Sequence, residues 1–224
     1  MTAVRVLLAD DQELLRYGFA MILGAQDDIE VVGQAADGGE AVRLATALRP
    51  DVVLMDVRMP GLDGIAATRQ ITALALPSRV LILTTFDLDE YAFEGLRAGA
   101  SGFLLKNVRP DELVAGIRSV AAGDAVLAPT TTRRLLDTYA SQFGTQAQTP
   151  PAEPGTLDTL TLRERDVFAE MAAGLTNKEI AQRLFLSETT VKTHVVRILA
   201  KLGLRDRVQA VIFAYETGIA RPNI

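Results

Sequence analysis

Hydrophobic residues in the first half of the chain form short runs that alternate with amphipathic stretches. Five apolar runs lie at about 4–9, 29–35, 51–56, 79–84 and 101–105. The stretches that follow them have the apolar spacing of helices and lie at about 11–24, 38–48, 64–74, 88–98 and 110–122. Strands separated by helices predict right-handed crossovers and a parallel sheet covered on both faces. We therefore expect residues 1–124 to form an α/β domain with a five-stranded, doubly wound parallel sheet.

The pattern changes beyond the helical segment at 129–141. Residues 142–155, QFGTQAQTPPAEPG, are rich in Gln, Thr, Pro and Gly and lack apolar periodicity, which is typical of a flexible linker. We therefore assign residues 125–156 to a linker with one helical segment. A second domain is expected at 157–224.

Helix-start signals divide this second domain into short helices. Thr161-x-x-Glu164 and Thr176-x-x-Glu179 are capping-box patterns, and each precedes an amphipathic segment. Ser187 is a suitable N-cap for a third helix at 188–202, which Gly203 would end. A fourth helix is expected at about 205–217. The second domain should therefore be small, all-α and of helix-turn-helix type.

Length, cysteine content and hydropathy restrict the class of protein. A chain of 224 residues exceeds the usual single-domain size of roughly 100 to 200 residues, which agrees with two domains. The absence of cysteine excludes disulfides and thiolate metal sites, and it fits a reducing compartment. No basic N-terminal segment leads into an apolar stretch, and no apolar run approaches the ~18 residues of a membrane helix. We expect a cytoplasmic protein that does not contact a membrane.

The charge is distributed unevenly between the two halves. Residues 1–154 hold 13 Lys and Arg against 20 Asp and Glu, a net charge of −7, whereas residues 155–224 hold 10 against 8, a net charge of +2. Only the second half is suited to a nucleic-acid backbone. Because its positive excess is small, a monomer should bind DNA weakly and a dimer is expected on DNA.

Polar residues stand at the ends of the apolar runs in the first domain. They are Asp10 and Asp11, Asp56, Thr84 and Lys106. The carboxyl ends of parallel strands meet at one edge of the sheet, so these residues should share a pocket. Three adjoining carboxylates repel one another and are best held together by a hard divalent cation, for which Mg²⁺ is the abundant choice. Asp56 can then attack a phosphoryl group, whose oxygens pair with the Thr84 hydroxyl and the Lys106 ammonium.

Each of these residues taken alone is more simply a helix cap or a solvated charge, but the complete ordered set favours a site. The segments LLADDQ, VVLMDVRMPGLDG, VLILTTFD and AGASGFLLK resemble the receiver domain of two-component response regulators, which is flavodoxin-like, over residues 1–124. The resemblance implies that Asp56 is the phosphoacceptor and that Lys106 is the phosphate-binding cation. It implies a switch made by Thr84 and Phe103, and a Mg²⁺ site made by Asp10, Asp11, Asp56 and the main-chain carbonyl of Arg58.

Two residues of this segment leave alternatives open. Phe103 is equally well explained as a plain core residue, because a phenylalanine has no hydroxyl to report a rotamer switch. Asn107 stands where many receivers have a proline after the lysine. Since a cis peptide bond without proline costs ~2.5–4 kcal/mol, the geometry of the Lys106–Asn107 bond is left open.

The expected helix 188–202 has two distinct faces. One carries a stripe at i, i+4, i+7 and i+11 made by Val191, Val195, Ile198 and Leu202, which should be buried. The opposite face carries small, apolar and cationic side chains, namely Thr189, Lys192, Thr193, Val196, Arg197 and Ala200. Such a face suits the major groove, where a lysine donates to guanine and a methyl packs on thymine. A merely solvated helix would carry more acids, and Glu188 at the helix start is the only one.

Residues 160–211, from LTLRERDVF to RDRVQAV, resemble the LuxR-type helix-turn-helix, so the whole chain resembles a NarL/FixJ-type response regulator. The resemblance implies DNA contacts by Thr176, Asn177, Lys178, Thr189, Lys192, Thr193, Val196, Arg197 and Lys201. Lys192 is the strongest candidate for base reading, and the valine at 196 shifts preference toward a thymine methyl. His194 is expected to be structural or to contact phosphate. Arg205 and Arg207 either contact phosphate or pair with acids of the first helix of this domain.

The expected function is a DNA-binding transcription factor that a sensor histidine kinase switches by phosphorylating Asp56. Double-stranded promoter DNA is the other partner, and activation should produce a homodimer. The protein should not be an enzyme beyond weak self-phosphorylation from small donors and self-dephosphorylation. One alternative is an aspartyl-nucleophile phosphatase, which usually needs a second acid where Arg58 stands. Another is a phosphorylation-independent DNA-binding regulator with a receiver-like dimerisation domain, which the complete pocket disfavours.

Overall fold

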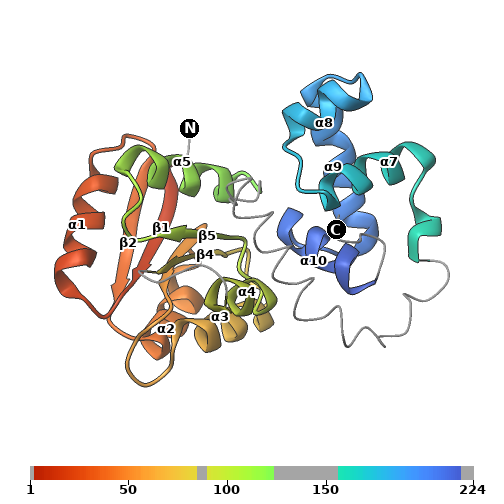
Figure 1. Cartoon of the computed structure of the whole chain (residues 1–224). Helices are drawn as coiled ribbons and strands as arrows, with labels where there is room; N and C mark the ends of the chain where they lie inside the picture. Colours follow the sequence, from red (N-terminus) through yellow and green to blue (C-terminus); the bar gives the residue numbers. More distant parts are fainter. Residues whose placement is uncertain (1–2, 85–89, 124–155, 218–224) are drawn as a thin grey trace. The chain divides into compact units, whose positions relative to one another are not determined.

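The structure is a computed structural model that describes residues 3–84, 90–123 and 156–217. The chain divides into two compact units, Met1–Val126 and Leu127–Ile224 (Figure 1). We call them the N-terminal unit and the C-terminal unit and describe each by itself. The linker predicted at 142–155 and the helical segment at 129–141 lie outside the described residues.

The N-terminal unit is built on a parallel sheet with the strand order β2-β1-β3-β4-β5. Its strands are β1 Val4–Ala9, β2 Ile29–Ala35, β3 Val52–Asp56, β4 Arg79–Thr84 and β5 Gly102–Leu105. The chain reverses its direction of winding between β1 and β3, which opens a crevice beyond the carboxyl ends of these two strands. The predicted five-stranded, doubly wound parallel sheet is thus confirmed.

Five helices cover the two faces of this sheet (Figure 1). They are α1 Glu13–Gly24, α2 Gly38–Leu48, α3 Gly64–Ala73, α4 Glu90–Arg97 and α5 Pro110–Ala121. Helices α1 and α5 lie on one face, where Phe19 and Ile117 pack with Val6 and Leu8 of β1. Helices α2, α3 and α4 lie on the other face. All residues of β3 are buried because both faces of the sheet are covered.

The C-terminal unit begins with a 3₁₀ turn at Thr156–Thr159 and continues as four helices. These are α7 Leu162–Ala172, α8 Asn177–Leu184, α9 Glu188–Leu202 and α10 Arg207–Glu216. Both predicted capping boxes are formed, at the starts of α7 and α8. Ser187 caps α9 by accepting a 3.1 Å hydrogen bond from the Thr190 amide, and Gly203 ends the helix with φ = 66°.

The core of the C-terminal unit is formed by the apolar faces of all four helices. Phe168 of α7 is fully buried, and its ring centroid lies 6.5 Å from that of Phe213 in α10. The predicted stripe on α9 lies in this core, with Val191 and Ile198 fully buried and Leu202 partly buried against them. Within residues 3–84, 90–123 and 156–217, no helix is both long and apolar enough to cross a bilayer.

Candidate functional site

Three carboxylates meet at the carboxyl ends of β1 and β3. Asp10 and Asp11 follow β1, and Asp56 is the last residue of β3. One carboxylate oxygen from each of these residues lies within 4.8 Å of the other two. Asp10 and Asp56 are 3% and 4% exposed, whereas Asp11 is exposed to solvent. The structure therefore brings the predicted acidic residues together, with Asp11 on the solvent side.

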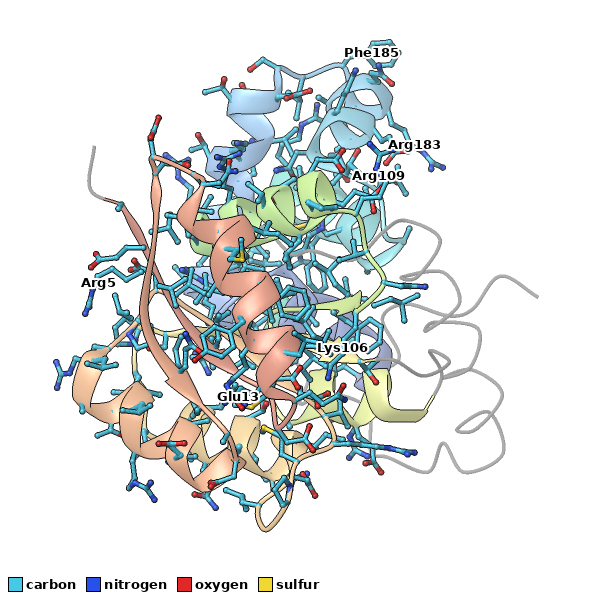
Figure 2. All side chains as sticks on the ribbon, turned by 90° about the vertical axis from the view of Figure 1, so that its left-hand side faces the viewer. Arg5, Glu13, Lys106, Arg109, Arg183 and Phe185 are labelled. Atoms are coloured by element: carbon cyan, nitrogen blue, oxygen red, sulfur yellow. The ribbon has the colours of Figure 1, made fainter. Side chains whose placement is uncertain are left out.

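Lys106, labelled in Figure 2, supplies a positive charge to the two buried carboxylates. Its Nζ lies 2.6 Å from Asp10 Oδ2 and 2.9 Å from Asp56 Oδ2, and its side chain is 4% exposed. The Lys106 amide also donates a 2.8 Å hydrogen bond to the Thr84 carbonyl, which anchors the end of β5 to the end of β4. Thr84 itself is buried at the end of β4. The predicted pocket residues thus share one edge of the sheet.

The charges of this cluster are not balanced. Burial raises the pKa of Asp56, and the charge of Asp10 adds to that effect, while Lys106 and the Arg58 backbone amide offset it only partly. Burial by itself lowers the pKa of Lys106, but its contacts with Asp10 and Asp56 more than compensate, so that this pKa is raised. The buried pair of carboxylates therefore has one cation for two negative charges, and a further cation would stabilise the ionised form of Asp56.

The donor atoms fit a hard divalent cation. Asp10 Oδ1 accepts a 2.9 Å hydrogen bond from the Gln12 amide, which orients the carboxylate. Asp10 Oδ2 is buried and lies 2.6 Å from the ammonium of Lys106. Carboxylate oxygens that converge in this way are the kind of donor that Mg²⁺ prefers.

Two glycines shape the loop that carries Asp56 into the following helix. A β-carbon at Gly64 would lie 1.8 Å from the Asp56 carbonyl oxygen, and one at Gly38 would lie 2.2 Å from the Leu62 carbonyl oxygen. The amides of both glycines also donate hydrogen bonds to this loop. The Gly64 amide donates to the Val57 carbonyl at 2.9 Å, and the Gly38 amide donates to the Leu62 carbonyl at 3.1 Å. Only glycine permits this close packing of backbones. The start of α3 is thereby pressed against the backbone of Asp56.

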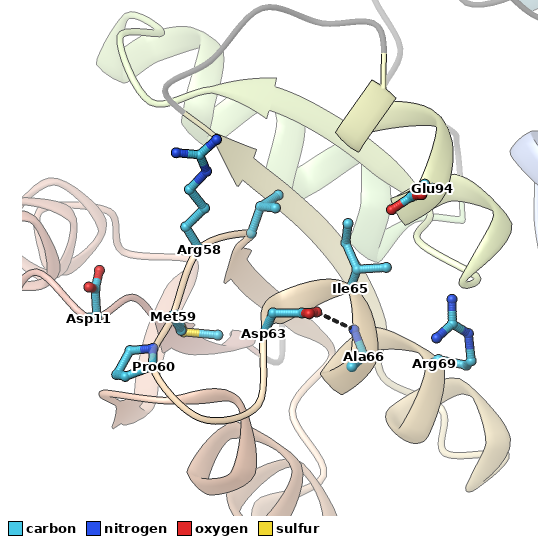
Figure 3. A pocket seen from close by; sticks show the side chains of 10 residues that line it. Asp11, Arg58, Met59, Pro60, Asp63, Ile65, Ala66, Arg69 and Glu94 are labelled. Carbon is cyan, nitrogen blue, oxygen red and sulfur yellow. Dashed lines mark hydrogen bonds between the residues drawn. The ribbon is translucent and has the colours of Figure 1, made fainter.

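A groove of about 630 Å³ lies along the outer side of this loop (Figure 3). Val57, Met59 and Ile65 contribute apolar surface, and Arg69 and Glu94 line it at the end formed by α3 and α4. At the other end it reaches Asp11 and Arg58, which belong to the predicted magnesium set. The groove therefore adjoins the acidic cluster. Sequence reasoning did not select the residues of its α3–α4 end.

The two residues left open by the sequence have clear places in the structure. Phe103 lies on β5 opposite Ile82 and is 3% exposed, so it is a core residue here; its role as a switch stays a prediction. No peptide bond among the described residues is cis, and the Lys106–Asn107 bond is therefore trans. Asn107 is exposed beyond the end of β5.

A second candidate site lies on the outward face of α9. All six residues predicted for this face are exposed, and Val196 is 67% exposed. Thr193 donates its hydroxyl to the Thr189 carbonyl at 3.0 Å. The face carries cations and small side chains opposite the buried stripe, as the helical spacing predicted. Such a face can enter a major groove.

Lys201 has a protein partner at the end of α9. Its Nζ lies 2.6 Å from Glu164 Oε2, and the Glu164 side chain is 4% exposed. The Lys201 contact, followed by the Thr161 backbone amide, lowers the pKa of Glu164 to about 2. The ion pair ties α9 to the start of α7. The Lys201 side chain is still 36% exposed, and its contact with DNA stays a prediction.

The start of α8 carries the remaining predicted DNA contacts. Thr176 and Lys178 are exposed, whereas Asn177 is partly buried and accepts a 2.9 Å hydrogen bond from Arg207. Arg207 also donates to the Leu175 carbonyl. These contacts join Arg207 to the first residue of α8 and to the loop before it, and its two predicted alternatives, a phosphate or an acid of α7, stay predictions.

His194 lies at the border of the α9 core stripe. It is partly buried, and its Nδ1 is enclosed without a hydrogen-bond partner among the described residues. Among the described residues, His194 does not belong to a group of three or more side chains that could hold a metal ion. Sequence reasoning missed the roles of Glu164 and Arg207 as links between helices, because their partners lie 37 and 30 residues away.

Comparison with known proteins identifies a family for each of the two units. Residues 6–118 match the family described as "Response regulator receiver domain", and residues 158–214 match "Bacterial regulatory proteins, luxR family". The chain therefore belongs to the two-component response regulators that join a receiver domain to a LuxR-type DNA-binding domain.

Full-length relatives share this organisation. "Uncharacterized transcriptional regulatory protein YxjL" of Bacillus subtilis (strain 168) is 47% identical over 97% of this chain and 98% of its own length. "DNA-binding transcriptional activator DevR/DosR" of Mycobacterium tuberculosis is 39% identical over 98% and 97%. The crystal structure of the response regulator ChrA of a heme-sensing two-component system is 34% identical and covers 98% of this chain and 100% of its own, with a TM-score of 0.52.

Proposed function

We propose that this response regulator is switched by phosphorylation of Asp56 and then binds promoter DNA through α9. The observation that carries the proposal is the buried pairing of Asp56 with Lys106 at 2.9 Å, beside Asp10 and Asp11 at the sheet's carboxyl edge. The phosphodonor is a sensor histidine kinase, as the family implies. Its two proposed partners are the phosphorylated histidine of the kinase and promoter DNA. Because both are found in the cytoplasm, we propose that the protein acts there.

The transfer needs a nucleophile and a cation for the phosphoryl oxygens. A carboxylate oxygen of Asp56 attacks phosphorus, a new O–P bond forms, and the P–N bond of the phosphohistidine breaks so that the imidazole leaves with its electron pair. Lys106 Nζ, already within 2.9 Å of Asp56, can follow the added phosphoryl oxygens. The Thr84 hydroxyl, on the neighbouring strand, is the second group assigned to them. Both donors stabilise the charge that gathers on those oxygens.

Asp10, Asp11, Asp56 and the main-chain carbonyl of Arg58 would hold Mg²⁺. When bound, the ion would screen the approaching phosphoryl charge from the carboxylates. The residues of the chain supply the rest: Gln12 orients Asp10 through its amide, and Gly64 holds the backbone of Asp56 against the start of α3. The acidic cluster is thereby preformed around the phosphoacceptor.

On the DNA side, we assign base contacts to the outward face of α9 and backbone contacts to the start of α8. Lys192 is the proposed donor to guanine, because it is exposed on the face opposite the core stripe. The net charge of +2 on residues 155–224 is small. We therefore infer that activation pairs two chains, so that two α9 helices read half-sites about one DNA turn, ~34–36 Å, apart.

The proposal is tested by labelling the full chain with acetyl phosphate or beryllofluoride in the presence of Mg²⁺. One phosphate should be gained and should map to Asp56. Asp56→Asn should abolish the labelling, and Asp51→Asn, at an exposed carboxylate at the opposite end of β3, should not. Light scattering should show a doubled mass after beryllofluoride. Labelling that persists in Asp56→Asn would contradict the assignment.

A further inference from the structure

The outward face of α9 carries a narrow row of methyl groups. Thr189, Thr193, Val196 and Ala200 follow one another at i, i+4, i+7 and i+11, the same spacing as the buried stripe on the opposite side of the helix. We call these four residues the methyl ridge. All four are exposed. Lys192 and Arg197 lie on its two sides, because they are neighbours in sequence of Thr193 and Val196.

Thr193 behaves as an apolar residue on this ridge. Its hydroxyl donates a 3.0 Å hydrogen bond to the Thr189 carbonyl of its own helix. That bond occupies the hydroxyl proton and turns the oxygen back toward the helix backbone. The methyl group of Thr193 is therefore what this side chain offers to a partner. Val196, three residues later, adds two more methyl groups and is 67% exposed.

Isolated apolar residues are common on protein surfaces and need no explanation. The methyl ridge differs because its members are in register with one another and are flanked by cations, with no acidic residue between Thr189 and Lys201. An apolar row between cations matches one nucleic-acid surface in particular. In the major groove the thymine C5-methyl is the apolar feature of the base edges, and phosphates line both sides.

We propose that Thr193 and Val196 pack against thymine C5-methyl groups, so that the half-site read by this chain requires thymines beside the base contacted by Lys192. This inference rests on the proposed function of α9 as the DNA-reading helix. The two ridge residues rise about 4.5 Å apart along the helix axis, close to the 3.4 Å spacing of bases along a strand. Two side chains at this spacing can reach neighbouring base pairs, and Val196, which is 67% exposed, offers the larger apolar surface to a thymine methyl.

The test replaces single thymines by uracil, which removes only the methyl group. A half-site is first selected from random duplexes with the full chain activated by beryllofluoride, and affinities are then measured by fluorescence anisotropy. Losing one buried methyl should weaken binding by the wild-type chain about fourfold at the thymine facing Val196. Val196→Ala should bind the thymine duplex about as weakly as wild type binds the uracil duplex, and it should lose its dependence on that methyl. Val196→Thr, which keeps one methyl group, should retain part of the dependence on the thymine methyl.

Leu162→Ala is the matched control, because Leu162 is an aliphatic residue of the same unit that is 82% exposed on another helix. It should keep the wild-type response to uracil. The inference is overturned if wild type binds thymine and uracil duplexes equally at every position, or if Val196→Ala keeps the full methyl dependence. It is also overturned if Val196→Ala strengthens DNA binding by the unphosphorylated chain and this gain is the same for thymine and uracil duplexes. The methyl ridge would then serve as a contact with the receiver domain and not with thymine. Absence of any sequence-selective DNA binding would instead contradict the proposed function itself.

Discussion

Removing the charge of Lys201 tests whether this lysine serves a structural ion pair with Glu164 or a contact with DNA. The ammonium lies 2.6 Å from Glu164, whose side chain is 4% exposed, while that of Lys201 is 36% exposed. While this pair holds, the carboxylate of Glu164 offsets part of the positive charge that Lys201 presents to a phosphate. Lys201→Met keeps most of the aliphatic stem and removes the charge. The variant therefore tests which partner the lysine serves on DNA.

The expected magnitude follows from counterion release. Each phosphate neutralised by a protein cation contributes about −0.9 to the slope of log K against log salt concentration. Lys201→Met should leave that slope unchanged and weaken binding equally at all salt concentrations, because α9 loses its tie to α7. If Lys192 meets the DNA, Lys192→Met should reduce the magnitude of the slope by up to about 0.9. Anisotropy titrations of the beryllofluoride-activated chain over a range of salt concentrations measure both slopes.

Glu164→Gln provides the complementary control. Glutamine keeps an oxygen that can accept the 2.8 Å hydrogen bond from the Thr161 amide but releases the ammonium of Lys201. The freed charge should make the salt dependence steeper than in the wild type. A slope reduced by about 0.9 in Lys201→Met, with unchanged thermal stability, would refute the ion-pair reasoning and assign Lys201 to a phosphate.

Two further predictions concern stability. Gly64→Ala should destabilise the N-terminal unit by about 1–3 kcal/mol in urea unfolding, because its β-carbon would meet the Asp56 carbonyl. Gly18→Ala, at an exposed position of α1 with no atom within 4 Å, should instead stabilise by about 0.5–1 kcal/mol, and equal effects of the two would contradict the packing argument. Glu164 has a pKa lowered from 4.5 to about 2, so its contribution to the stability of the C-terminal unit should be complete above pH 4.5 and disappear as the pH falls toward 2. Thermal melts of wild type and Glu164→Gln should converge at the acidic end, and a constant difference across this range would disprove the linkage.

Local sequence signals determined much of this protein. The five strands and the caps at Thr161, Thr176 and Ser187 agree with the structure, because strand periodicity and helix capping depend on residues within one turn or one strand. The pocket residues were also predictable, since parallel strands place their carboxyl ends at a single edge. Asp10 and Asp56 therefore converge although 46 positions separate them in the sequence.

Only the tertiary structure decided which partner each charged side chain takes. Lys201 had the helical position of a DNA contact, but the packing of α7 on α9 brings Glu164 within 2.6 Å. Arg207 had acids and phosphates as candidates, and the folded chain adds Asn177 and a loop carbonyl, which the sequence did not indicate. The requirement for glycine at 38 and 64 likewise arises from backbones that meet only after folding. Helix spacing determines which face a residue occupies, but the residue opposite that face depends on how distant segments pack.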